Sequence, residues 1–200
     1  MRQLLLATRN PHKTREFSEI LGQDFVVRDL SGEPEGPMIE ETGTTFAENA
    51  ILKAVGISKR FPGLVVSDDS GLEVDALGGA PGVYSARYAG PDVTDAENMT
   101  LLLSELGKLS REQPFTARFR CVLAVAREGE LIKTFEGAIE GTIVDSPRGS
   151  SGFGYDPIFQ PTGSTETFAE LSPEKKNGMS HRARAIRGLQ AALSAGLTLA

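Results

Sequence analysis

The sequence predicts an α/β fold built on a mixed β-sheet. Helical and strand patterns alternate over the first half of the chain, which is typical of parallel strands connected by helices. A long hairpin pattern fills much of the second half and adds antiparallel strands. The 200 residues fit one sizeable domain or two lobes sharing one sheet. No internal repeat or linker-like tract interrupts them, so we expect a single domain over residues 1–200.

A strand and a capped helix are expected first. Residues 2–8 have the pattern of a strand, and a helix follows over 11–21. Asn10 before Pro11 is a good helix start, because asparagine caps a helix and proline suits its first position. Gly22 then ends this helix.

Capping signals predict the later helices as well. Thr45 with Glu48, and Thr94 with Glu97, form capping boxes in which a hydroxyl residue precedes a glutamate by three positions. The expected helices are 46–59, a helix from Thr94 to Leu106 closed by Gly107, and 181–195, which begins at the capping residue Ser180.

Strand patterns occupy the intervals between these helices. Residues 115–126 alternate at their start, and "EGE" then turns the chain into 131–144, which predicts a long antiparallel hairpin. The other expected strands are 25–28, 64–68 and a further one from Gly71 that runs into a Gly-rich loop.

Composition and charge indicate a globular chain, with the cytoplasm as the default location. Hydrophobic residues are 40% and charged residues 24%, which argues against disorder. A net charge of −6 disfavours nucleic acid or an anionic membrane as the main partner. The N-terminal apolar run is too short for a signal peptide or a membrane span. The single cysteine, Cys121, alternates with Phe119 and Leu123, so we expect an inward strand position.

The stretch "TRNPHK", residues 8–13, lies between the first strand and the first helix. The amide donors of a helix N-terminus, together with Lys13, suit a phosphate group. The alternative is a capped helix with solvated basic residues.

Two acidic pairs, Glu40–Glu41 and Asp68–Asp69, are a candidate metal site. Mg²⁺ takes oxygen ligands from a few carboxylates and keeps several waters. Two independent solvated turns are the alternative.

Strand geometry separates Asp68 from Asp69. Successive side chains of a strand point to opposite faces, so only one of the two is expected to bind a metal directly. Asp69 is the better candidate, because we expect the chain to bend directly after it at Ser70-Gly71. Asp68 then orients a neighbouring group or faces solvent.

The stretch "GSSGFGYDP", residues 149–157, is a candidate site for a planar base. Its glycines let the backbone approach a ligand closely, and Phe153 or Tyr155 is suited to stacking. Asp156 is suited to accepting hydrogen bonds from a base edge. The alternative is a flexible loop with its aromatic side chains packed inward.

Basic residues are concentrated in "KKNGMSHRARAIR", residues 175–187. Ser180 places His181 and Arg182 in the first turn of a helix, where cations oppose the helix dipole. A bound anion would remove this conflict. A solvated basic face explains Arg184 and Arg187 well, but His181 and Arg182 less well.

Taken together, the four stretches predict a nucleotide site with carboxylates for a metal, basic helix starts for phosphates and an aromatic loop for a base. Neither a Walker phosphate loop nor a dinucleotide fingerprint is present, since "GGAPG" has neither spacing.

These motifs resemble the inosine triphosphate pyrophosphatase family. The resemblance runs over nearly the whole chain through "LATRNPHK", "EETGTTFAENAILKA", "DDSGLEVDALGGAPGVYSARYAG", "GFGYDPIF" and "SHRARAIRGL". The second, third and fourth of these, in this order, are highly specific. Many relatives carry Gly-Lys where Ala183-Arg184 stands here, but this departure falls after the His-Arg pair.

The resemblance implies a set of site residues. Asp69 would be the proton acceptor and would hold Mg²⁺ together with Glu40 or Glu41. The residues implied in substrate binding are Thr8, Arg9, Asn10, Pro11, His12, Lys13, Lys53, Ser70, Phe153, Gly154, Tyr155, Asp156, Lys176, His181 and Arg182.

The resemblance also implies the activity and the assembly. The expected reaction is Mg²⁺-dependent hydrolysis of dITP, ITP and XTP to the monophosphate and pyrophosphate, which removes non-standard purines from the nucleotide pool. A homodimer is implied, and an elongated sheet with the active-site cleft between two lobes. A Maf-like pyrophosphatase with other base preferences is the nearest rival, but the "SHR" and "GFGYDP" stretches favour the inosine type. A nucleotide- or RNA-binding module without catalysis would leave the acidic residues without a purpose.

Overall fold

The first helix begins and ends where its capping residues predict. A computed structural model of the chain describes residues 2–32, 39–109 and 114–195. The helix α1 spans Pro11–Leu21, and the Asn10 side chain accepts hydrogen bonds from the backbone amides of His12 and Lys13. Gly22 ends the helix with φ at +73°, a conformation that glycine adopts at little cost. This part of the sequence prediction is confirmed.

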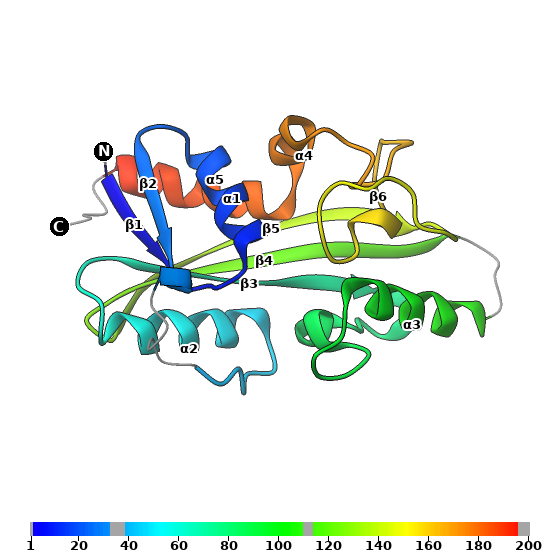
Figure 1. Cartoon of the computed structure of the whole chain (residues 1–200), viewed down its shortest axis with the longest axis horizontal. Helices are drawn as coiled ribbons and strands as arrows, with labels where there is room; N and C mark the ends of the chain where they lie inside the picture. The colour runs from blue at the N-terminus through cyan, green and yellow to red at the C-terminus, as the bar shows by residue number, and fades with distance from the viewer. Residues whose placement is uncertain (1, 33–38, 110–113, 196–200) are drawn as a thin grey trace. The chain divides into compact units, whose positions relative to one another are not determined.

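The described residues form a mixed six-stranded sheet in the order β2-β1-β3-β4-β5-β6. The strands β1 and β2 are parallel, as are β1 and β3, whereas β5 and β6 are antiparallel. The strands are β1 (Arg2–Leu6), β2 (Phe25–Asp29), β3 (Val65–Val74), β4 (Phe115–Arg127), β5 (Glu130–Ile143) and β6 (Phe159–Pro161). The remaining α-helices are α2 (Phe46–Ser58), α3 (Asp95–Gly107), α4 (Pro173–Met179) and α5 (His181–Ser194). The expected fold class, a mixed sheet flanked by helices, is confirmed (Figure 1).

The chain divides into two compact units, which we call unit 1 and unit 2. Unit 1 comprises residues 1–69, 121–137 and 182–200, and unit 2 comprises 70–120 and 138–181. The single domain and the cleft between two lobes stay predictions.

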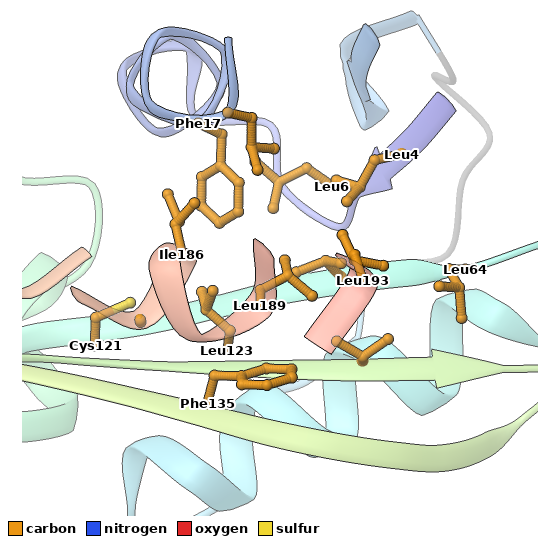
Figure 2. Packing of buried hydrophobic residues seen from close by; sticks show 14 residues of the cluster. Leu4, Leu6, Phe17, Leu64, Cys121, Leu123, Phe135, Ile186, Leu189 and Leu193 are labelled. Atoms are coloured by element: carbon orange, nitrogen blue, oxygen red, sulfur yellow. The ribbon is translucent and has the colours of Figure 1, made fainter. Parts of the chain in front are cut away.

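Unit 1 has helices on both sides of its strands, with α1 and α5 on one side and α2 on the other (Figure 1). On the first side, Phe17 of α1 and Ile186 and Leu189 of α5 pack with alternate residues of the strands (Figure 2). Cys121 belongs to this cluster and is fully buried, as its alternation predicted. On the other side, Ile57 of α2 packs against Val65 and Leu30.

Unit 2 has a core of its own, in which aromatic side chains are prominent. Phe119 of β4 contacts both Phe159 and Phe168, with ring centroids 4.7 and 5.8 Å away. Leu102 and Leu106 of α3 belong to the same cluster.

The capping box of Thr94 and Glu97 that begins α3 is present, as is that of Thr45 and Glu48 at α2.

The strand prediction was wrong around the two aspartates. We expected a strand ending at Asp68, a bend at Ser70-Gly71 and a separate strand afterwards, but β3 continues without interruption to Val74. Gly71 permits a close approach instead, because a Cβ there would lie 2.3 Å from the Ser85 hydroxyl oxygen. The strand tolerates these turn-forming residues because cations pair with the carboxylates of Asp68 and Asp69, and because Gly71 leaves room for Ser85.

The remaining differences from the sequence prediction concern short segments between the main elements. The short helix α4 was not predicted, although Ser172 caps it and Pro173 occupies its first turn. Residues 33–38, between the strand expected at 25–28 and the helix expected at 46–59, lie outside the described residues. No helix in the described part of the chain is long and apolar enough to cross a membrane.

Candidate functional site

The two adjacent aspartates of β3 point to different layers of unit 1. Val66 and Asp68 face the side of α1 and α5, where Asp68 meets Lys13 and Arg182. Asp69 faces the side of α2, where it contacts Lys53. The alternation of the strand therefore separates the two carboxylates, as the sequence predicted.

Asp68 is the anionic centre of a buried cluster. Its carboxylate lies 2.5 Å from Nζ of Lys13 and 2.8 Å from Nε of Arg182. The thiol of Cys121 donates to the same carboxylate at 3.2 Å. Arg182 also contacts a second carboxylate, that of Glu16, at 2.5 Å. Asp68 therefore does not face solvent; it orients the two cations, which was one of the two roles expected for it.

The electrostatics of Asp68 follow from these contacts. Burial alone would raise its pKa, but the charges of Arg182 and Lys13 outweigh burial and hold the pKa well below its ordinary value. The carboxylate is therefore ionised at neutral pH.

Arg182 is a cation in the first turn of α5, and from the sequence we inferred that a bound anion would remove its conflict with the helix dipole. In the structure, the carboxylates of Asp68 and Glu16 compensate its charge, and only 1% of its surface is exposed. Sequence reasoning missed Glu16. A usable signal was present, since Glu16 follows Lys13 by three positions and so lies on the same side of α1.

Asp69 and Glu41 share one cation, the ammonium group of Lys53. The Nζ atom of Lys53 donates to both carboxylates at 2.8 Å and to the backbone carbonyl of Asp68 at 3.1 Å. Burial raises the pKa of Asp69 and the nearby Glu41 adds to this, while Lys53 and Lys13 lower it; the net shift is upward. Burial lowers the pKa of Lys53, but Asp69 and Glu41 outweigh it, so Lys53 remains a cation.

The donor set around Lys53 suits a hard divalent cation. Two carboxylate oxygens and one carbonyl oxygen converge on a single positive charge, and Mg²⁺ takes such oxygen ligands, usually one or two carboxylates completed by phosphates and water. Glu40 is exposed and Glu41 half-buried. Among the described residues, no three His, Cys, Asp or Glu side chains gather as a metal-binding group.

The segment Thr8–Lys13 places a helix start beside this cluster. The Thr8 hydroxyl accepts a hydrogen bond from the amide of Asn10, whose side chain caps α1. Lys13 then extends from the first turn, and its Nζ donates to the carbonyl oxygen of Asp68 at 3.2 Å. Lys13 and Lys53 thus meet at one carbonyl, from opposite layers of unit 1. Arg9 and Pro11 are exposed, and His12 is half-buried.

In unit 2, two of the residues implied in substrate binding, Phe153 and Lys176, contact a third, Asp156. Its carboxylate oxygen Oδ2 lies 2.6 Å from Nζ of Lys176 and accepts the backbone amide of Phe153 at 2.9 Å. The same Nζ lies 5.1 Å from the ring centroid of Phe153. Asp156 is only 2% exposed, so its carboxylate helps to hold the fold of the loop in addition to being a candidate hydrogen-bond acceptor.

The other aromatic groups of unit 2 are packed inward. Tyr155 is buried, and its hydroxyl donates to the Ser85 carbonyl at 2.9 Å. His181 stacks on Phe119 with ring centroids 4.8 Å apart. Of the two rings suited to stacking on a base, only Phe153 is partly exposed. Ser70 is half-buried on β3.

Comparison with known proteins gives matches over nearly the whole chain. Residues 4–192 match the model of the Ham1 family. A dITP/XTP pyrophosphatase of Bacillus subtilis strain 168 is 50% identical over 196 residues, which cover 98% of each chain. The solved structure of the Staphylococcus aureus Ham1 protein is 42% identical, with a TM-score of 0.85 over 97% of this chain and 99% of that chain. A HAM1 protein from Coxiella burnetii is 40% identical, with a TM-score of 0.87 over 98% and 100%.

Proposed function

This chain belongs to the Ham1 family, and from that premise we propose that it hydrolyses dITP, ITP and XTP to the nucleoside monophosphate and pyrophosphate. The observation that supports the proposal most strongly is the pairing of Asp69 with Lys53 and Glu41 beside the Lys13 helix start. Cations for phosphate oxygens and a carboxylate for proton transfer are what hydrolysis of a phosphoanhydride requires.

Asp69 is the proposed general base. A base must be ionised and of moderate basicity to take a proton from an attacking water, and burial raises the pKa of Asp69 toward that range. The water attacks the α-phosphorus, its proton passes to Asp69, and pyrophosphate leaves. Lys13 and Lys53, which carry positive charge at this point, stabilise the charge that develops on the phosphate oxygens. Arg182 holds Asp68, and Asp68 in turn aligns Lys13.

Glu41 and Asp69 are the residues we propose to hold Mg²⁺, with Glu40 in a supporting position. When bound, Mg²⁺ supplies positive charge that neutralises phosphate oxygens and polarises water. Lys53 contacts the oxygens of both carboxylates, so the protein already balances their charge with a cation.

Base selection is proposed to rest on unit 2. A 6-oxo purine presents an acceptor where adenine presents an amino donor, so donors aimed at that position discriminate between them. Lys176 and His181 are the proposed donors, and Phe153 the stacking surface. A buried polar group left unpaired by the wrong base costs about 1–3 kcal/mol.

We further propose a homodimer that acts in the cytoplasm on free nucleotides and removes non-standard purines before they enter DNA or RNA. Neither nucleic acid nor membrane is a proposed partner.

The test is release of pyrophosphate from dITP, XTP, ITP, ATP and dTTP, with Mg²⁺ and after its removal by a chelator. We expect turnover of the three 6-oxo nucleotides, very little of ATP or dTTP, and none without the metal. Equal rates on ATP and dITP would contradict the proposed base selection, and full activity with the chelator would contradict the proposed metal.

A further inference from the structure

The loop that carries Phe153 is held at several points within unit 2. At its far end, the Tyr155 hydroxyl donates to the Ser85 carbonyl, and Asp156 accepts the Phe153 amide. In the middle, the Gly154 amide donates to Oδ2 of Asp95 at 2.6 Å. Asp95 lies at the start of α3, 59 positions earlier in the sequence, and the loop reaches toward it (Figure 1).

The contact of Asp95 is not needed to cap its own helix. Thr94 caps α3 by accepting the amide of Glu97 at 3.3 Å, and Glu97 returns the contact by accepting the Thr94 amide at 2.7 Å. Asp95 adds a second acidic residue to this first turn, where it interacts favourably with the helix dipole but supplies no cap. Its carboxylate is aimed at the loop.

A side chain would have open space at Gly154, which is itself half-buried. Its φ is +61°, in the left-handed region, and a Cβ built there would meet no heavy atom within 4 Å. By contrast, a Cβ at Gly152, two residues earlier, would lie 2.0 Å from the Asp156 carboxylate. The hydrogen bond to Asp95 restrains the middle of the loop, directly beside Phe153.

From these contacts we infer that Asp95 is a positioning residue for base recognition: its carboxylate fixes the Gly154 amide and thereby the ring of Phe153. The inference rests on the proposed function, because it assigns the loop to the nucleobase. The negative charge of Asp95 also acts on the next residue of the loop. The pKa of Tyr155 is raised mainly by burial, with smaller contributions from Tyr88 and Asp95.

The consequence is a separation of binding from chemistry. A loosened Phe153 holds the base less well in both the ground state and the transition state, so KM rises while kcat stays the same. The reacting phosphorus is assigned to Asp69, Lys13 and Lys53, which belong to unit 1, whereas Asp95 and the loop belong to unit 2.

The experiment compares D95A and D95N with the wild type. Asparagine keeps a carbonyl oxygen that accepts the Gly154 amide and removes only the charge, so it is the matched control for the helix dipole. We expect D95A to raise KM for dITP about tenfold, the scale of one lost hydrogen bond, with kcat unchanged, and D95N to remain close to the wild type. Hydrogen exchange of the Gly154 amide, followed by NMR, should accelerate in D95A and not in D95N.

Three outcomes decide the matter. A wild-type KM in D95A would overturn the inference, as would D95N being impaired as much as D95A, which would indicate a role of the charge in the helix alone. A wild type that releases no pyrophosphate from dITP would contradict the proposed function instead. In that case faster Gly154 exchange in D95A would still support the positioning contact.

Discussion

Replacing Asp68 by asparagine tests whether the buried cluster of unit 1 depends on its charge. The Asp68 carboxylate and Glu16 together balance Lys13 and Arg182. In D68N the shape is almost unchanged, but two cations face a single carboxylate. The asparagine NH2 group would also face the N–H donors of Lys13 or Arg182, so at least one hydrogen bond is lost.

The expected cost follows from the burial of the pair. The side chains of Asp68 and Arg182 are 0% and 1% exposed, so water cannot compensate the charge that loses its partner. Removing one member of a buried ion pair costs about 3–5 kcal/mol of unfolding free energy. The control is Glu140→Gln, which removes a carboxylate from Arg118 on a side chain that is 60% exposed; exposed pairs contribute about 0–1 kcal/mol.

Urea unfolding of the wild type, D68N and Glu140→Gln, followed by circular dichroism at several pH values, measures the unfolding free energy that each substitution removes. Because the pKa of Asp68 is depressed in the folded protein, the ionised carboxylate stabilises the wild type above the unfolded-state value of about 3.9. That stabilisation is lost as pH falls below this value through the folded pKa, so the difference between wild type and D68N should shrink there. A D68N loss at neutral pH no larger than that of the Glu140 control would refute the reasoning.

Two further predictions concern the other carboxylates. Lys53→Met removes a charge that lowers the pKa of Asp69; since Asp69 must be ionised to act as a base, the acidic limb of the residual kcat should move to higher pH, and an unmoved limb would count against Asp69 as the base. Gly152→Ala places a Cβ 2.0 Å from the Asp156 carboxylate, whereas Gly78→Ala has a similar positive φ and open space. Both should lose about 1–2 kcal/mol through backbone strain, and Gly152→Ala clearly more; equal losses in thermal unfolding would show that the Asp156 contacts are not tight.

Local signals in the sequence were sufficient where an element is fixed by its own residues. Asn10 and Pro11 predict the start of α1 because the cap and the first turn are adjacent in sequence. The capping boxes predict α2 and α3 for the same reason. The alternation around Cys121 predicts its burial, since strand periodicity needs no knowledge of distant segments.

The sequence did not predict features that depend on distant partners. Asp68, Asp69 and Ser70 look like the end of a strand, yet β3 runs through them, because Lys13, Lys53 and Arg182 neutralise the two charges. These partners lie 55, 16 and 114 positions away from the aspartates they contact. Periodicity and capping patterns carry no information about such separations.

The hydrogen bond between Asp95 and Gly154 is of the same kind, with 59 positions between its partners. Strand alternation nevertheless supplied the essential step for the site, because it assigned the two adjacent aspartates to different faces before any partner was known.

The position of bond cleavage tests the central claim most directly. Hydrolysis of dITP in ¹⁸O-labelled water, with mass spectrometry of both products, shows which phosphorus the water attacks. Attack at the α-phosphorus predicts label in the monophosphate and none in pyrophosphate, and Asp69→Asn should abolish the labelled product. Label in pyrophosphate, release of single phosphate, or an undiminished rate in Asp69→Asn would contradict the account.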